Sequence, residues 1–360
     1  MIIQPDVKLF KSRHKTKKPQ LMWIKASGDL ETPVSIMIRV ANKKANSFLL
    51  ESVQGGSQRG RYSAIGLDPD LIWKCQGSKA EINHNPSDKK SEFIKEKVSA
   101  LNSLEAIIDE SRIDIPENLP PMSSGLFGYI GYDMIRLMEK IPDKNKDSLN
   151  LPDGLLIRPK IMIIFDNVED VVYIITPIWP KKSMGILSAY KAGEKRLINI
   201  VNSFEKRIVK EKSKKTKNYS PKPKSNTTKS QYFTMVKKAK KYIRDGDIFQ
   251  VVPSQRFSIP FTKPPFNLYR SLRRLNPSPF LFFMNFGNFS IVGSSPEILV
   301  RLKDNQVTIR PIAGTRKRGS NKSEDRKLSE ELLKDPKEIS EHLMLLDLGR
   351  NDIGRVSKIG

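Results

Sequence analysis

Short runs of β-branched and aromatic residues restrict the fold of this chain more than any other feature. "SFLLESV", "KIMIIF" and "DVVYIITPI" are such runs, and a helical pattern over 183–207 follows them. Later, "FLFFMNFGNFSIVGSS" and "EILVRLKDNQVTIRPIAG" each place a turn, "FGN" or "KDNQ", between two apolar runs, which is typical of hairpins. The sequence therefore predicts the α+β class, with antiparallel strands and helices between them.

The composition changes sharply over 206–229. The segment "KRIVKEKSKKTKNYSPKPKSNTTK" has almost no apolar periodicity, so burial cannot offset its ordering entropy. We interpret it as a basic, flexible linker between an N-terminal region, 1–205, and a C-terminal region, 230–360. Beyond it, helical spacing over 230–243 ends at Gly246, and "IFQVVPSQRFSI" is expected to be a strand.

The chain is strongly basic, with 64 Lys and Arg against 39 Asp and Glu and a formal net charge of +25 over 360 residues. This balance favours an anionic partner, whether a polyanion, an acidic lipid or an anionic metabolite. The lysine-rich linker fits a nucleic-acid-binding protein, which is the alternative function. Only Tyr219 lies among its cations, however, so the segment lacks the aromatic residues of a stacking platform, and we do not predict nucleic-acid binding as the main function.

Cysteine and histidine usage argues against disulfides and structural zinc. Cys75 is the single cysteine, and His14, His84 and His342 are far apart in the sequence. No apolar run reaches bilayer-spanning length, and the basic run after the first residues reverses the charge order of a secretory signal. We expect a cytoplasmic protein with no membrane segment.

Two carboxylates on one predicted helix could bind a metal ion. In "DPKEISEHLMLLDLGRND", Asp335 is the expected N-cap, and Glu338 and Glu341 then share a face. Such a pair suits Mg²⁺, which keeps several waters and accepts further oxygens from an anionic substrate. The alternatives are that Glu338 completes a capping box and that Glu341 is an ordinary first-turn acid.

Two other segments carry polar residues in settings that suit chemistry. Glu297 follows Pro296 at the start of a strand-like run, where partial dehydration would favour a general acid and solvent exposure would make it a strand-edge charge. In "PIAGTRKRG", a Gly-Thr turn precedes Arg316, Lys317 and Arg318, an arrangement that favours an anionic ligand.

These motifs together resemble anthranilate synthase component I, a branch of the chorismate-utilising enzyme family. The matching segments, in the family's order, are "LLESVQGGSQRGRYSAIG", "GLFGYIGYDMIRLMEKIP", "GDIFQVVPSQRF", "NPSPFLFFMNF", "IVGSSPEILVRL", "PIAGTRKRG" and "KEISEHLMLLDLGRND". The resemblance implies antiparallel sheets packed in layers with surrounding helices. It also implies a lyase that converts chorismate and ammonia to anthranilate and pyruvate in tryptophan biosynthesis.

Site residues follow from the resemblance. It implies that Gly314 and Thr315 contact chorismate and that Glu341 binds Mg²⁺, with Glu338 supporting it. Glu297 matches the acid that protonates the departing hydroxyl, and the three cations after Thr315 are expected to give a local positive field.

Two positions separate sibling enzymes. Gln250 stands where members that activate water have a lysine, and Ala313 stands where aminodeoxychorismate synthases often have one. Both favour anthranilate formation, with aminodeoxychorismate or isochorismate synthase as the alternative. Without the alignment, Gln250 is an ordinary surface glutamine of a strand.

The resemblance also implies feedback by L-tryptophan in a pocket that joins an N-terminal strand to a strand of the catalytic region. Two amino acids of this pocket have simple alternatives, Ser52 as a plain strand serine and Phe282 as a core aromatic. The matching positions are Ser52, Pro33, Pro279, Phe280, Leu281, Phe282 and Gly293. Such a pocket would let the effector bias how the two regions pack.

Family members usually receive ammonia from a separate glutamine amidotransferase subunit, component II, and Cys75 lacks the setting of an amidotransferase nucleophile. The family continues through a further catalytic stretch beyond "GRVSKIG". The sequence therefore predicts a fragment, inactive by itself and prone to associate, or else a catalytically silent effector-binding or assembly subunit.

Overall fold

The computed structural model describes residues 2–14, 18–41, 44–54, 58–88, 90–180, 184–208 and 221–358. The chain divides into two compact units, Met1–Ile208 with Leu268–Gly360, and Val209–Asn267. This division differs from the predicted boundaries, because residues 268–360 belong with the N-terminal region. Residues 209–220 of the predicted linker lie outside the described residues.

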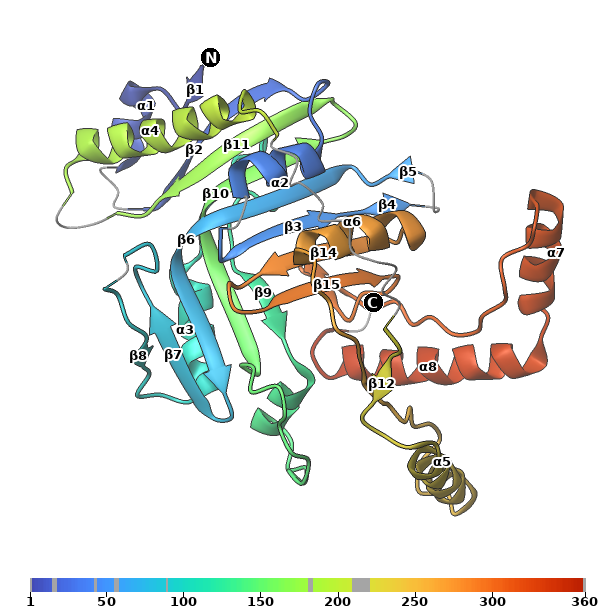
Figure 1. Cartoon of the computed structure of the whole chain (residues 1–360). Coiled ribbons are helices and arrows are strands. Elements are labelled where there is room, and N and C mark those ends of the chain that lie inside the picture. Colours follow the sequence, from blue (N-terminus) through green and yellow to red (C-terminus); the bar gives the residue numbers. More distant parts are fainter. Residues whose placement is uncertain are drawn as a thin grey trace. The chain divides into compact units, whose positions relative to one another are not determined.

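The first unit is built on one antiparallel sheet (Figure 1), which confirms the predicted fold class. Within the described residues this sheet has 11 strands, in the order β1-β2-β11-β10-β6-β3-β14-β15, with β7 and β8 continuing from β6 and β9 pairing with β10. The strands are β1 (Ile3–Gln4), β2 (Gln20–Ser27), β3 (Ser47–Glu51), β6 (Tyr62–Gln76), β7 (Lys79–Asn83), β8 (Ile94–Lys95), β9 (Phe127–Ile130), β10 (Gly154–Asp166), β11 (Val171–Ile178), β14 (Phe280–Asn285) and β15 (Ser290–Ser295).

Some helices of this unit pack on the sheet, and two short strand pairs form sheets of their own. The helices of the unit are α1 (Val7–His14), α2 (Pro33–Ala41), α3 (Ala100–Glu110), the 3-10 helix η1 (Tyr132–Leu137), α4 (Ile186–Phe204), α6 (Pro265–Leu275), α7 (Lys322–Leu332) and α8 (Pro336–Gly354). The short pairs are β4 (Val53–Gln54) with β5 (Gln58–Arg59), and β16 (Arg301–Lys303) with β17 (Gln306–Thr308). In Figure 1, α1, α2 and α4 lie on one face of the sheet.

The core follows from the alternation of side chains along the long strands. On β6, Ile72 packs in one cluster with Phe48 and Ile157, while the next residue, Trp73, packs in another with Ile107 of α3. Successive residues of a strand face opposite sides of the sheet, so a strand that is apolar on both faces is buried on both. The Trp73 indole N–H is satisfied by Ser103 Oγ at 3.0 Å.

Two hairpins confirm the predicted turns. The "FGN" turn joins β14 to β15 with Gly287 at φ +94°, and the "KDNQ" turn joins β16 to β17 with Asp304 and Asn305 at positive φ. The β14–β15 hairpin joins the main sheet because β14 pairs with β3, setting Phe282 opposite Leu50. This long-range pairing is why residues 268–360 belong with the N-terminal region.

The second unit contains α5 (Lys229–Arg244) and the two-residue strands β12 (Lys224–Ser225) and β13 (Phe257–Ser258). Thr228 and Gln231 form a capping box at the start of α5, and Gly246 at φ +80° follows its end, so the predicted helix is confirmed. The strand predicted over 248–259 is wrong except for β13, because an apolar run becomes a strand only where a neighbouring strand pairs with it.

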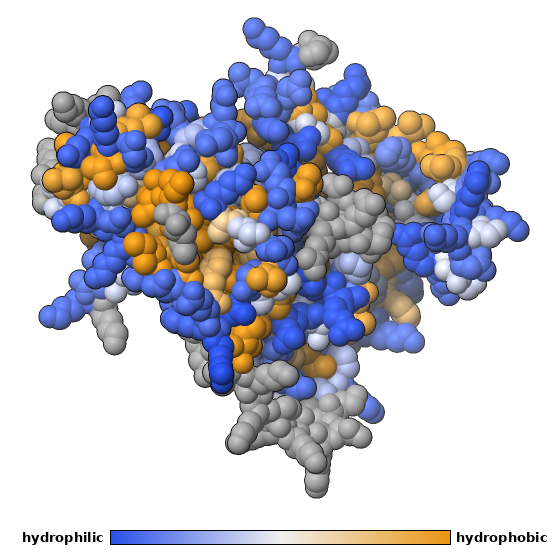
Figure 2. Space-filling view, turned by 90° about the horizontal axis from the view of Figure 1, so that it is seen from above, coloured by the Kyte–Doolittle hydropathy of each residue, from blue (hydrophilic) through white to orange (hydrophobic). Residues whose placement is uncertain are grey.

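The surface is largely hydrophilic, as the charge count requires. Figure 2 shows charged and polar residues over most of one face, with apolar patches between them. The exposed apolar residues include Ile339, Leu343 and Leu346 of α8, at 40%, 55% and 49% exposure.

Candidate functional site

The start of α8 is fixed by its N-cap. Asp335 accepts hydrogen bonds from the backbone N–H groups of Lys337 at 3.0 Å and Glu338 at 3.4 Å, and Pro336 occupies the first turn, as predicted. The hydrogen bond from Arg316, together with these backbone donors, lowers the pKa of Asp335. A charged cap therefore sets the register of Glu338 and Glu341.

Residues 309–314 run antiparallel to α8. A side chain added at Gly349 would meet the Ile309 side chain, and one added at Gly314 would meet the Glu338 carboxylate at 3.0 Å. From 338 to 349 a helix rises about 16 Å, and five extended residues span about the same length. The "PIAGT" segment therefore lies along the helix, with its turn near Glu338.

Gly314 is required at this turn for two reasons. Its φ of +82° is one that other residues rarely adopt, and Glu338 leaves no room for a Cβ. Thr315 follows as an exposed residue. The fold thus brings Gly314 of the predicted substrate turn against Glu338 of the predicted metal-binding face.

Arg316 binds the carboxylates around this turn. Its Nε lies 3.1 Å from Glu331 Oε1, its Nη2 lies 2.6 Å from Asp335 Oδ2, and its Nη1 lies 3.5 Å from Glu338 Oε1. The hydrogen bonds to Asp335 and Glu331 raise the pKa of Arg316. Arg318 pairs with Asp325 at 2.9 Å.

Ion pairs reduce the expected local positive field at both arginines. Arg316 pairs with Glu331 and Asp335, and Arg318 pairs with Asp325. The Arg316 guanidinium also orients the Glu338 carboxylate, from 3.5 Å. The predicted capping role of Glu338 is replaced by this ion pair.

An open pocket of about 450 Å³ lies beside the C-terminal half of α8. Its lining includes apolar side chains and three charged residues, Glu297, Arg310 and Asp352. Its lining residues are Ser295, Glu297, Ile298, Leu299, Ile309, Arg310, Pro311, Leu345, Leu348, Gly349 and Asp352. Sequence reasoning missed Arg310, although it directly precedes the quoted motif "PIAGTRKRG".

Glu341 is a residue of α8, and Glu297 lies in the pocket beside the same helix. Glu297 lines the pocket from the loop after β15, and Glu341 precedes the lining residue Leu345 by one helical turn on the same face. Glu341 is partly buried, and Glu297 is exposed. The expected dehydration of Glu297 is not found among the described residues, because the loop after β15 leaves its side chain on the rim.

The carboxylates of α8 fit a magnesium ion in number and type. Glu341 and Glu338 are three residues apart on one face, and Mg²⁺ is commonly bound through one or two carboxylates with water and substrate oxygens. Among the described residues there is no cluster of three or more His, Cys, Asp or Glu side chains that could hold a metal ion alone.

Of the residues expected to bind tryptophan, Phe280, Leu281, Phe282 and Gly293 lie on β14 and β15, and β14 pairs with β3, which Ser52 follows. Phe282 lies opposite Gly293, and its ring occupies the space that a side chain there would need, 2.0 Å from the added Cβ. Leu281 is buried opposite Glu51, the residue before Ser52. Of the other positions, Pro279 is partly buried and Phe280 exposed before and at the start of β14, and Pro33 is buried at the start of α2.

A buried charged cluster beside this junction was not predicted. The Glu51 carboxylate accepts from Tyr269 Oη at 2.5 Å and from Arg273 Nε at 2.7 Å and Nη2 at 2.8 Å. Burial and the Glu51 charge raise the pKa of Tyr269, and the hydrogen bond to Glu51 raises that of Arg273. The charged residue inside the apolar strand "SFLLE" was the only signal in the sequence.

Gln250 belongs to the second unit, where it is exposed and lies outside any strand. Its predicted placement in a strand is wrong, because no neighbouring strand pairs with this part of the chain. No described helix is long and apolar enough to cross a membrane.

Comparison with known proteins assigns the family. A model for chorismate binding enzymes matches residues 45–360. This chain belongs to that family. The anthranilate synthase component 1 of Cereibacter sphaeroides is 48% identical over 98% of this chain and 70% of its own length, and that of Pseudomonas putida is 42% identical over 92% and 67%.

Solved structures agree with this assignment. Anthranilate synthase component I from Streptococcus pneumoniae TIGR4 is 33% identical, with a TM-score of 0.68 over 83% of this chain and 62% of that chain. The menaquinone-specific isochorismate synthase of Escherichia coli is 14% identical, with a TM-score of 0.58 over 94% of this chain and 67% of that chain, and so shares the fold. The present chain spans roughly two thirds of the length of these four proteins.

Proposed function

We propose that this chain is the large subunit of an anthranilate synthase. It converts chorismate and ammonia to anthranilate, pyruvate and water, in the first step of tryptophan biosynthesis. The observation that carries the proposal is the arrangement of Glu297, Gly314 and Glu341 along α8, where a substrate-sized pocket is located. The relatives named anthranilate synthase component 1 support the choice of reaction.

The chain's own residues divide the chemistry between them. Ammonia forms the new C–N bond to the ring. On the family resemblance alone, since its side chain is exposed here, Glu297 gives a proton to the departing hydroxyl, which leaves as water. Elimination of the side chain as pyruvate then makes the ring aromatic. Gly314 and Thr315 form the compact turn that lets the backbone approach the substrate.

Glu341 would hold Mg²⁺, and Glu338, itself oriented by Arg316, would support it. The bound ion supplies positive charge for the ring carboxylate of chorismate. Arg310, the positively charged residue in the pocket lining, would attract a carboxylate of chorismate.

The choice among sibling reactions depends on Gln250 and Ala313. A neutral amide at position 250 does not deprotonate water, and alanine at position 313 does not form a covalent adduct, so both favour the amine-transferring reaction. For these two positions the support is the family resemblance. Aminodeoxychorismate or isochorismate synthesis remains the alternative reaction.

L-Tryptophan is the proposed effector, bound where β3 meets β14 and β15. Ser52 follows β3, and Phe282 and Gly293 face each other across the β14–β15 pair. Because β3 and β14 come from distant parts of the sequence, a ligand at their junction can favour one packing of these strands over another. Pro33, Pro279, Phe280 and Leu281 complete the proposed site.

The proposed partner is a glutamine amidotransferase subunit that supplies ammonia, and the proposed location is the cytoplasm. Cys75 supports a separate partner, because burial raises the pKa of its thiol to about 11, which is unsuited to a nucleophile. Without this partner, the ammonia would have to come from free ammonium.

Chorismate binding tests the proposal. Equilibrium dialysis with chorismate and MgCl₂ should show Mg²⁺-dependent binding by the chain, and Glu341→Gln should remove the Mg²⁺ dependence. Asp347→Asn is the matched control, because Asp347 lies on α8 but pairs with Arg350 away from the pocket lining. Absence of chorismate binding, or binding that is the same with and without Mg²⁺, would contradict the proposal. Anthranilate fluorescence in the presence of ammonium distinguishes the sibling reactions.

A further inference from the structure

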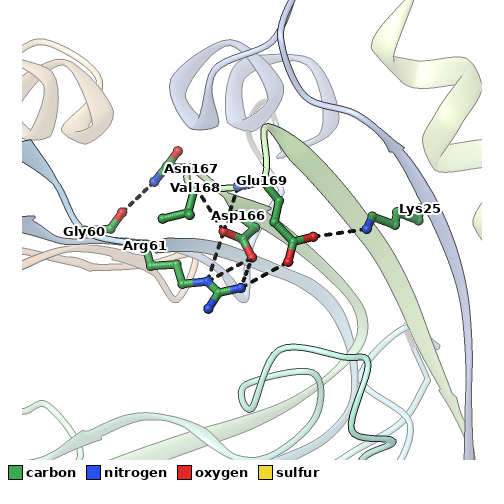
Figure 3. A network of polar contacts seen from close by, with 7 residues as sticks. All are labelled: Lys25, Gly60, Arg61, Asp166, Asn167, Val168 and Glu169. Carbon is green, nitrogen blue, oxygen red and sulfur yellow. Dashed lines mark hydrogen bonds and ion pairs between the residues drawn. The ribbon is translucent and has the colours of Figure 1, made fainter.

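The turn between β10 and β11 is held by a dense set of polar contacts (Figure 3). Asp166 is 2% exposed and accepts from Arg61 Nε at 3.1 Å and Arg61 Nη2 at 2.9 Å. The backbone N–H of Val168 also donates to it at 3.1 Å. Glu169 joins the network by accepting from Arg61 at 3.3 Å and from Lys25 of β2 at 3.1 Å.

Asp166 is ionised in this setting. Burial by itself would raise the pKa of Asp166, but the hydrogen bonds from Arg61 and the two backbone donors together lower it. A buried carboxylate with this many donors has one favourable orientation, so residues 166–169 form a fixed platform at the end of the β10–β11 hairpin.

Asn167 transmits the position of this platform to another part of the chain. Its backbone N–H donates to Arg61 O at 2.7 Å, and its side-chain Nδ2 donates to Gly60 O at 2.7 Å. In Figure 3 the Asn167 amide points toward Gly60, away from the carboxylates of Asp166 and Glu169. The side chain therefore positions Gly60 while the ion pairs hold the turn.

Gly60 in turn contacts Ser52. The Gly60 N–H donates to Ser52 O at 2.7 Å, and a Cβ on Gly60 would lie 2.6 Å from both Cβ and Oγ of Ser52. Such close approach leaves Ser52 little freedom to move independently of Gly60. A continuous series of contacts thus leads from Asn167 through Gly60 to Ser52.

We propose that Asn167 is a positioning residue for the effector site, setting the affinity for an amino acid at Ser52 through Gly60. The inference rests on the proposed tryptophan site. Asn167 lies at the end of a hairpin and does not line the pocket beside α8, so the loss of its amide should change effector binding and leave chorismate binding intact.

The test compares the binding of two ligands to the wild-type chain, to two Asn167 variants and to one control variant. Isothermal titration with L-tryptophan and, separately, with chorismate and MgCl₂ is run on the wild-type chain, Asn167→Asp and Asn167→Ala. Asn167→Asp keeps the size and turn preference of the residue but places an acceptor against the Gly60 carbonyl, whereas Asn167→Ala only removes the donor. Asn102→Ala, an exposed position on α3, is the matched control.

We expect tryptophan binding to weaken about five- to tenfold in Asn167→Ala, the effect of one lost hydrogen bond, and at least as much in Asn167→Asp. Chorismate affinity should stay within twofold, and the control should match wild type for both ligands. If the variants bind tryptophan like wild type, or lose both ligands equally, Asn167 has only a structural role and the inference is overturned.

A wild-type chain that does not bind tryptophan would overturn both the effector site and this inference. The chorismate titration would still test the proposed reaction independently. Circular dichroism checks the fold of each variant, and the alanine variant remains decisive if the aspartate variant does not fold.

Discussion

The Glu51–Tyr269–Arg273 cluster gives the most quantitative prediction. The Glu51 side chain is 4% exposed, and the ion pair with Arg273 joins β3 to α6 across more than 200 residues of sequence. Removing one partner of a buried ion pair typically costs about 3–5 kcal/mol, because the remaining charge stays buried without compensation. Since Arg273 is 23% exposed, water screens part of this effect, and we expect Arg273→Met to lower the free energy of unfolding by about 3 kcal/mol.

Tyr269→Phe should have a smaller effect of about 1.5–3 kcal/mol, the usual contribution of a hydrogen bond to a charged group. Urea unfolding followed by tryptophan fluorescence measures both, since Trp23 and Trp73 are buried in the sheet of the same unit. Arg274→Met is the matched control, because Arg274 is the exposed neighbour on α6 and should change stability by less than about 0.5 kcal/mol.

A double-mutant cycle isolates the interaction. In the Glu51→Gln background, Arg273→Met should cost at least about 1 kcal/mol less than in wild type, because no buried carboxylate is left unpaired. If Arg273→Met and Arg274→Met destabilise equally, or if the two cluster mutations are additive, the reasoning that β3 and α6 are held together by this charge is refuted.

Three further predictions concern other sites. Gly314→Ala should destabilise the chain by about 1–2 kcal/mol and weaken chorismate binding, because the positive φ and the Glu338 carboxylate both oppose a Cβ; Gly354→Ala, with open space around it, is the control in the same thermal unfolding and dialysis assays. Burial raises the pKa of Cys75 to about 11, so at pH 8 its reaction with a thiol reagent should be at least about 100-fold slower than that of free cysteine and should become fast in urea; rapid reaction of the folded chain would contradict the burial. The lowered pKa of Asp166 means that its stabilisation is present above the unfolded value near pH 4 and is lost as the pH falls through the folded value. The stability difference between wild type and Asp166→Asn should therefore shrink below about pH 4 in urea titrations, and a difference that is independent of pH would count against the ion pair.

Local signals in the sequence were sufficient for many elements. The "KDNQ" turn lies where Asp304 and Asn305 adopt positive φ, and α8 begins at its predicted cap. Turns and caps are read correctly because hydrogen bonds within a few residues determine them. The strand expected over 248–259 is wrong outside β13, because a strand forms only where another strand pairs with it, and local sequence does not show that partner.

In the candidate site too, local sequence indicated some features and contacts between distant segments determined others. Residue types in "PIAGT" and "KEISEH" indicated a substrate turn and a metal-binding face, and the structure brings Gly314 against Glu338. The neutralisation of Arg316 depends on Glu331 and Asp335, which only the folding of α7 and α8 brings to it. Charge in the sequence therefore did not predict the local field.

The sequence by itself determined the α+β class, the hairpins, the capped helix and, through ordered motifs, the family. The tertiary structure decided which regions form one unit, which charges are paired and which residues surround Ser52. The physical reason is range: backbone dihedrals, caps and turns depend on neighbours along the chain, whereas the pairing of β3 with β14 and the burial of Glu51 depend on contacts between distant segments that form only on folding.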